Sequence, residues 1–209
     1  MQVFVYPKSR HVRTQTPFAY SDYSRFKPAL QTEFGRRCVY CREPDSIRGS
    51  NTFGVDHYRP KAHFSALSNE YLNLYYCCNT CNTWKSDYWP WNREATRFIP
   101  NPCDHEMFRH MRYLSDGSVE GRTEAGIGAV ETLHLNDDRT VKWRASIDTV
   151  VEMLRGNESR ALRILSNMAQ KLKAGTISAA KEAADAAKTS FDLQRTRDAL
   201  ATFGEAPLL

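Results

Sequence analysis

Two Cys-x-x-Cys motifs are the residues of this chain whose spacing most clearly predicts a metal site. The first contains Cys38 and Cys41, and the second contains Cys78 and Cys81. A Cys-x-x-Cys turn places two sulfurs at adjacent corners of a tetrahedron, about 2.3 Å from a zinc ion. Two such turns complete a four-thiolate structural site, which leaves no coordination position open for catalysis. We therefore predict one shared structural Zn²⁺.

The separation of the two motifs indicates that a folded element lies between them. The intervening residues 42–77 number 36, whereas such motifs are commonly separated by about 15–20 residues. The alternatives are two unrelated cysteine pairs or a redox pair, and a redox pair would call for a thioredoxin-like βαβ pattern that is absent. The other two cysteines, Cys77 and Cys103, have no thiol three residues away. We expect them to be small buried side chains.

Polar residues between and just after the motifs carry the predicted chemistry. Asp56 offers an anionic oxygen to a hard cation such as Mg²⁺ or Mn²⁺, and its neighbour His57 can accept a proton near neutral pH. Asn82 directly follows the second motif and offers a neutral carbonyl oxygen. A phosphodiesterase that uses one divalent metal needs oxygen ligands and a base for the attacking water. The pattern therefore predicts a metal-dependent nuclease site on a zinc-stabilised scaffold.

Each of these side chains also has a purely structural alternative. Asp56 could cap a turn, and Asn82 could cap the helix that follows it. Lys85, one helical turn beyond Asn82, either touches the scissile phosphate or is solvated. Arg59 and Lys61 either bind nucleic-acid phosphates or stabilise their own loop.

Tryptophans gather near the end of the same region. Trp84, Trp89 and Trp91 are expected to be core or bracing residues. Stacking on an unpaired base is the alternative.

The charge distribution favours a polyanionic partner. The chain of 209 residues has a net charge of +5, and its first 43 residues contain eight Lys and Arg against three Asp and Glu. The whole excess therefore lies at the N-terminal end, which favours nucleic acid, with a solvated face as the alternative. No apolar run approaches the about 20 residues of a membrane span, and no secretory signal is evident. We expect a cytoplasmic protein with no membrane partner and no disulfides.

Three regions differ in pattern, and together they predict an α+β fold. Residues 1–37 are basic and contain one expected helix, in which Pro28 suits the first turn and Gly35 marks the end. Residues 38–100 have weak periodicity, so we expect short strands and turns around metal. Residues 101–209 are expected to be mainly α-helical. Capping residues predict three helices there: from Asp137 or Asp138 to about Leu154, from Asn157 to about Leu172, and from Thr176 to about Phe203.

The chain resembles the HNH endonucleases, whose active site is a ββα-metal finger. The resemblance covers about residues 36–90 and rests on nine positions: Cys38, Cys41, Asp56, His57, Asn73, Cys78, Cys81, Asn82 and Lys85. It implies that His57 is the general base and that Asn73 holds the histidine loop. It also implies that Asp56 and Asn82 bind a catalytic Mg²⁺ or Mn²⁺. At position 82 this chain has Asn instead of His, a variation within the family that keeps a metal ligand.

A longer signature resembles the PtuB-type HNH proteins of Septu phage-defence systems. It consists of residues 56–61, 71–74, 78–87, 99–104 and 133–136. The resemblance implies the effector of a bacterial anti-phage system, regulated by an ATPase partner. No motif distinguishes DNA from RNA, and we expect DNA as the substrate in preference to RNA. A homo-oligomer is a further alternative that the sequence allows, with the helical C-terminal region as its assembly surface. The alternative function is a catalytically silent, zinc-organised module that binds nucleic acid or protein.

Overall fold

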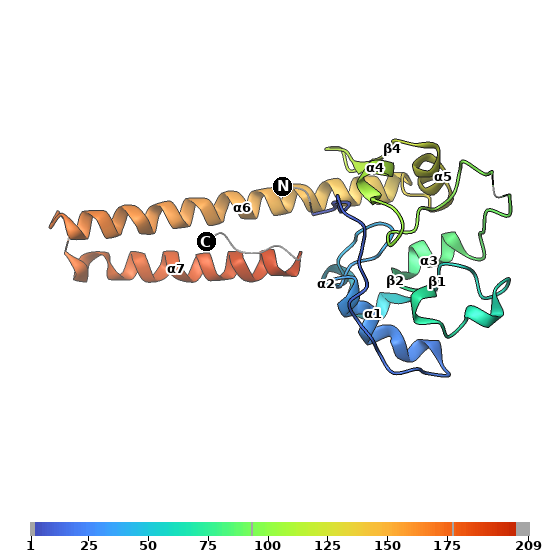
Figure 1. The fold of residues 1–209 in the computed structure, drawn as a ribbon. Helices are drawn as coiled ribbons and strands as arrows, with labels where there is room; N and C mark the ends of the chain where they lie inside the picture. Colours follow the sequence, from blue (N-terminus) through green and yellow to red (C-terminus); the bar gives the residue numbers. More distant parts are fainter. Residues whose placement is uncertain (1–2, 93, 177, 204–209) are drawn as a thin grey trace. The chain divides into compact units, whose positions relative to one another are not determined.

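The computed structural model describes residues 3–92, 94–176 and 178–203. The chain divides into two compact units. The first unit ends at Ala145, and the second unit begins at Ser146. Figure 1 shows their elements. Within the described ranges, no helix combines the length and the apolar character that crossing a membrane requires.

The first unit contains a ββα unit (Figure 1). Strands β1 (Phe53–His57) and β2 (Leu74–Cys78) pair antiparallel, and helix α3 (Asn79–Lys85) follows β2 directly. The register pairs Phe53 with Cys78. All five residues of β2 are buried, because helices pack against both strands. This burial explains the weak periodicity of the sequence here, since a strand covered on both faces shows no apolar–polar alternation. The expectation of short strands in place of a large sheet is confirmed.

Helix α1 (Lys27–Glu33) confirms the helix expected in the basic N-terminal segment (residues 1–37). Pro28 occupies its first turn, and Gly35 follows its end with a φ of 59°, a conformation that glycine adopts without steric strain. The other short elements before β2 are one helix and four 3-10 turns: α2 (Asp45–Arg48), η1 (Tyr23–Phe26), η2 (Ser50–Thr52), η3 (Ser65–Leu67) and η4 (Tyr71–Asn73).

Some residues of the basic N-terminal segment pack into the core, while its Lys8 and Arg10 are exposed. Phe4 and Tyr6 are each 1% exposed, and the Tyr6 ring stacks on Tyr113 with 5.1 Å between centroids. Arg13 lies among aromatic rings, with its guanidinium carbon 4.7 Å from the Phe34 centroid and 4.5 Å from that of Tyr75. Its Nη2 donates to the Leu74 carbonyl at 2.7 Å. Arg13 therefore stabilises the fold, although its charge had suggested a phosphate contact.

Residues 101–209 are mainly helical, as expected, but they also contain a short hairpin that the sequence interpretation did not anticipate. Strands β3 (Met111–Tyr113) and β4 (Val119–Gly121) pair antiparallel between helices α4 (Met107–His110) and α5 (Glu124–Thr132). The connecting turn contains Gly117 at a φ of 84°. An Asp-Gly pair between short apolar runs favours such a turn.

The second unit contains an α-helical hairpin. Helix α6 (Asp138–Lys173) begins in the first unit and continues through the second, and α7 (Ala179–Thr202) runs back beside it (Figure 1). The third expected helix is confirmed, but the break expected at Asn157 is wrong, because α6 passes through this position uninterrupted. An interior Asn costs less than about 1 kcal/mol. Beside it, the fully buried Glu158 carboxylate accepts from the guanidinium of Arg197 on α7 at 3.0 Å.

Candidate active site and metal centre

Four cysteines converge on one point of the first unit. The Sγ atoms of Cys38, Cys41, Cys78 and Cys81 all lie within 4.8 Å of one another, and those of Cys41 and Cys78 are 3.7 Å apart. Zinc–sulfur bonds of about 2.3 Å in a tetrahedron place sulfurs about 3.8 Å apart. The buried thiols therefore fit a structural zinc ion. Cys77 is fully buried, as expected, and its sulfur lies 3.9 Å from that of Cys38. The same expectation is wrong for Cys103, which is only half-buried.

The ββα unit positions both motifs. The first is tied to β2, because the Val39 amide donates to the Tyr76 carbonyl at 3.0 Å. The second begins where β2 ends, and the Cys78 sulfur accepts from the Cys81 amide at 3.4 Å in the first turn of α3. Residues far apart in the sequence are thus brought together by strand pairing and by the strand-to-helix junction.

His57 ends β1 with its ring in a defined orientation. Its Nε2 lies 2.9 Å from the Ser68 carbonyl oxygen. A carbonyl oxygen can only accept, so Nε2 must carry the proton and Nδ1 keeps a lone pair. Burial lowers the pKa of His57 below its ordinary value, which keeps the ring neutral at neutral pH. The Tyr23 ring packs edge-on against it at 4.6 Å. This arrangement suits a base that accepts a proton at Nδ1.

Asp56 is buried and held at both carboxylate oxygens. Its Oδ2 accepts from the Tyr40 hydroxyl at 2.6 Å, and its Oδ1 lies 3.0 Å from the Lys85 ammonium. Lys85 is 2% exposed and also donates to the His57 carbonyl at 2.7 Å. Neither expected alternative for Lys85, contact with phosphate or exposure to solvent, fits this burial. In this structure Lys85 orients Asp56, and Tyr40 connects Asp56 to the first cysteine motif.

We expect Tyr40→Phe to lower the free energy of unfolding by about 1.5–3 kcal/mol, because it removes a hydrogen bond to a buried charged group. Burial raises the pKa of Tyr40 well above its ordinary value, so the hydroxyl remains a donor at neutral pH. Chemical denaturation of the zinc-loaded protein measures the change. Tyr88→Phe is the matched control, since the Tyr88 hydroxyl donates to the Arg97 carbonyl near the surface. Equal stability of the two variants would contradict the role assigned to Tyr40.

Asn73 braces the loop that follows His57. Its Oδ1 accepts from the Arg59 amide at 2.9 Å. Its Nδ2 donates to the carbonyls of Arg59 at 3.0 Å and Leu67 at 3.3 Å. The same loop presents the Ser68 carbonyl to the His57 ring. Asn73 is buried. It therefore holds the backbone of this loop in place, and the loop in turn orients the His57 ring.

A cavity of about 300 Å³ brings four of the predicted site residues together: Asp56, His57, Lys61 and Asn82. Its lining consists of Tyr23, Val55, Asp56, His57, Pro60, Lys61, Ala62, Asn82, Ser86 and Asp87. Lys61 reaches it, and its ammonium lies 3.3 Å from the Tyr23 hydroxyl. Arg59 does not line this cavity, and its guanidinium instead lies 5.8 Å from the Trp89 ring centroid.

Tyr23 and Asp87 are site residues that the sequence interpretation missed. The Asp87 carboxylate is 66% exposed and lies 3.7 Å from the His63 ring nitrogen. Ser86 also lines the cavity, and its φ of 48° is uncommon for a residue other than glycine. The proximity of Asp87 to Lys85 in the sequence was the available signal. No signal in the sequence pointed to Tyr23, since it lies 34 residues before His57.

The oxygen-bearing side chains of this cavity fit a hard divalent cation. Asp56, Asn82 and Asp87 line it together, and carboxylate and amide oxygens are suitable ligands for Mg²⁺ and Mn²⁺. An ionised carboxylate has about four lone-pair positions, whereas Tyr40 and Lys85 occupy one each on Asp56. Asp56 therefore keeps the capacity to bind a cation.

Comparison with protein families assigns a class to this region. Residues 38–87 match the model of the HNH endonuclease family. The match covers about a quarter of the chain and contains both cysteine motifs, β1, β2 and α3. A search of curated proteins finds no match. The geometry and the family match together support an HNH domain, a class that hydrolyses phosphodiester bonds in nucleic acid.

Proposed function

We propose that this protein is a divalent-metal-dependent endonuclease that cleaves nucleic acid, DNA in preference to RNA. The observation that carries the proposal is the orientation of His57, whose Nε2 is bonded to the Ser68 carbonyl. Nδ1 is thereby left as a base in the cavity lined by Asp56 and Asn82. The HNH match over the same residues supports the reaction class. The preference for DNA is a hypothesis that the cleavage assay below tests directly.

In the proposed reaction, His57 accepts a proton from water at Nδ1 as the water oxygen bonds to phosphorus. The bond from phosphorus to the 3′ oxygen breaks, and the 3′ oxygen leaves and takes up a proton from solvent. Asp56 and Asn82 would hold Mg²⁺ or Mn²⁺, which supplies charge stabilisation to the phosphate oxygens when bound. Lys61, at the cavity wall, adds a positive charge for the phosphate backbone. Lys85 is a positioning residue that acts through Asp56.

The direct test is incubation of zinc-loaded protein with plasmid, linear duplex, single strands and tRNA. Each substrate is tested with Mg²⁺, with Mn²⁺ and with a chelator that leaves the structural zinc in place. We expect cleavage that requires the added metal, with DNA cut faster than RNA. A folded protein that binds these substrates but cuts none of them would favour the catalytically silent binding module.

We further propose a role as the cytoplasmic effector of an anti-phage defence system, with an ATPase partner. Residues 99–104 and 133–136 support this role by their resemblance to the PtuB type, and they lie outside the segment that matches the HNH model. The neighbouring gene should then encode an ATPase that copurifies with the protein. Absence of such a neighbour would contradict the defence role and leave the nuclease proposal intact.

The exposed charges of the basic N-terminal segment should add affinity without adding sequence specificity. Replacing Lys8 and Arg10, both exposed, with Ala should weaken binding similarly for all sequences. The double substitution should also reduce the slope of log affinity against log salt by at most about 2. Arg112→Ala is the control, because Arg112 is exposed but paired with Glu120 at 3.0 Å. A loss confined to one sequence would contradict a purely electrostatic role.

A further inference from the structure

An aromatic shelf, formed by His63, Phe64, Trp89 and Trp91, has no role in the mechanism above. Trp91 is 65% exposed. Its ring is nearly parallel to that of Phe64, with 16° between planes and 5.9 Å between centroids. The His63 ring packs edge-on against it at 5.0 Å. The indole is thus braced by neighbours while much of its surface remains open.

The shelf is anchored to the core of the first unit. Trp89 packs edge-on against Phe64 at 5.1 Å and against Tyr58 at 5.8 Å. The Tyr58 hydroxyl donates to the Ile99 carbonyl at 2.8 Å. A fixed aromatic surface in water indicates a binding site more strongly than a single mobile apolar side chain does.

Two chain segments connect the shelf to the catalytic cavity. Lys61 and Ala62 line the cavity and lead directly into His63 and Phe64. On the other side, Asp87 lines the cavity two residues before Trp89, and its carboxylate lies 3.7 Å from the His63 Nε2. The shelf therefore lies at the rim of the site proposed for phosphodiester hydrolysis.

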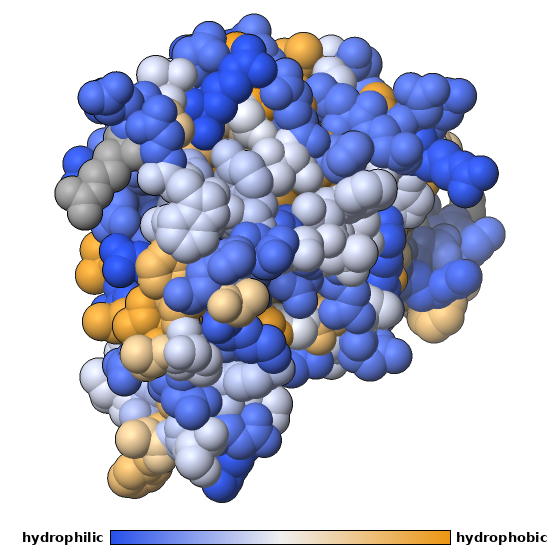
Figure 2. All heavy atoms as spheres, turned by 90° about the vertical axis from the view of Figure 1, so that its right-hand side faces the viewer, coloured by the Kyte–Doolittle hydropathy of each residue, from blue (hydrophilic) through white to orange (hydrophobic). Residues whose placement is uncertain are grey.

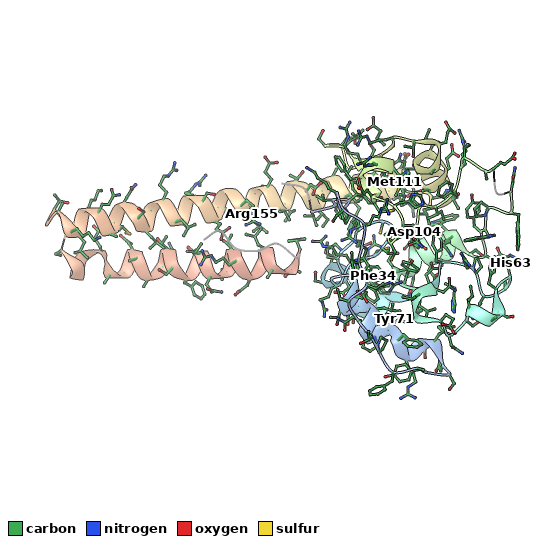
Figure 3. The ribbon with its side chains drawn as sticks, in the orientation of Figure 1. Phe34, His63, Tyr71, Asp104, Met111 and Arg155 are labelled. Atoms are coloured by element: carbon green, nitrogen blue, oxygen red, sulfur yellow. The ribbon has the colours of Figure 1, made fainter. Side chains whose placement is uncertain are left out.

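The surroundings of the shelf are polar. His63 lies at the right-hand side of Figure 3, and Figure 2 looks onto that side, where hydrophilic and intermediate side chains cover most of the surface. Lys61 contributes a positive charge at the cavity wall, and the Arg59 guanidinium lies near Trp89. Aromatic rings interleaved with basic side chains match the alternation of base and phosphate in a nucleic-acid strand.

Resting on the nuclease function proposed above, we propose that the shelf stacks an unpaired nucleobase next to the scissile phosphate. The substrate class is then single-stranded or locally unpaired nucleic acid. Only an unpaired base can expose its π-face to a protein ring, because bases inside a duplex are covered by their neighbours. Stacking tolerates any base, so the shelf selects strand structure and not sequence.

The test measures binding of short oligonucleotides to the full chain carrying His57→Ala, without added Mg²⁺ or Mn²⁺, so that no cleavage occurs during the measurement. A fluorescent base analogue reports stacking. Adding Trp91→Ala should weaken single-strand binding by about 5- to 100-fold and change blunt-duplex binding by less than about 2-fold. Trp91→Phe should retain most of the affinity. Trp84→Ala is the matched control and should change neither, because Trp84 is 49% exposed but packs on the His134 ring at 3.9 Å.

Abasic substitution locates the contact on the strand. One abasic position should reproduce the loss in the protein with Trp91 intact, and the same substitution should cause no further loss in the Trp91→Ala protein. Equal losses for single strand and duplex would overturn the proposal in favour of a duplex contact, and no loss for either would point to a protein partner. Because binding is measured without cleavage, stacking by a protein that cuts nothing would refute the nuclease proposal and not the shelf.

Discussion

Replacing His57 with alanine should lower the rate of metal-dependent cleavage by about 10²–10⁴-fold, the usual contribution of a general base. The loss should fall on kcat, since the ring is oriented to accept a proton from water and makes no contact that the mechanism assigns to substrate binding. Zinc content should not change, because the four cysteine sulfurs converge without the histidine. Single-turnover cleavage of the preferred substrate gives the chemical rate directly.

Two controls make the His57 experiment specific. His105→Ala removes a histidine that packs against Phe98 and His110, and it should leave the cleavage rate unchanged. Free imidazole should partly restore cleavage by the His57→Ala protein, because the missing ring leaves space beside the cavity that His57 lines. Near-normal cleavage by a folded His57→Ala protein would remove this residue from the mechanism.

Local spacing was sufficient to predict the parts of the site that depend on short segments. The two Cys-x-x-Cys turns and a helix at the second of them follow from neighbouring residues, although α3 begins at Asn79, so Asn82 lies inside this helix and does not cap it. The helix at Pro28 and Gly35 was predictable for the same reason. Such features need no knowledge of the tertiary structure.

The partners of Asp56 could not be predicted, because they come from other parts of the chain. Tyr40 lies 16 residues before it and Lys85 lies 29 residues after it. Lys85 followed the second cysteine motif and was expected to face phosphate or solvent. Its burial depends on how α3 packs against β1, and the sequence of α3 does not specify that packing.

In the C-terminal half, the hairpin that was not anticipated and the helix break that was wrong have different causes. The Asp116-Gly117 turn was a visible hairpin signal, but strands of three residues are too short to show periodicity. At Asn157, a capping preference of about 1 kcal/mol indicated a helix end. The buried Glu158 beside it is held by Arg155 and Arg197 at 3.3 and 3.0 Å, and tertiary packing of this kind overrides a local preference.

Replacing Cys81 with serine should unfold the ββα unit or abolish its cooperative melting. Structural zinc contributes about 10–16 kcal/mol of apparent binding free energy in small zinc domains, whereas a whole domain is stable by only about 5–15 kcal/mol. The strands of this unit have five residues each, so few other interactions can replace the metal. We expect loss of bound zinc, measured by metal analysis, together with a large fall in melting temperature.

Cys103→Ser is the matched control for the loss of a thiol. Cys103 is outside the group of four and accepts a hydrogen bond from the Tyr75 hydroxyl at 3.6 Å, so its replacement should leave zinc content unchanged. Asp56→Ala gives a second comparison. It should abolish cleavage with zinc still bound, but it should also destabilise the fold by about 3–5 kcal/mol, because the buried Lys85 ammonium loses its counter-charge. A Cys81→Ser protein that keeps its zinc and melts like Cys103→Ser would refute the four-thiolate site, since the two variants differ only in which thiol is lost.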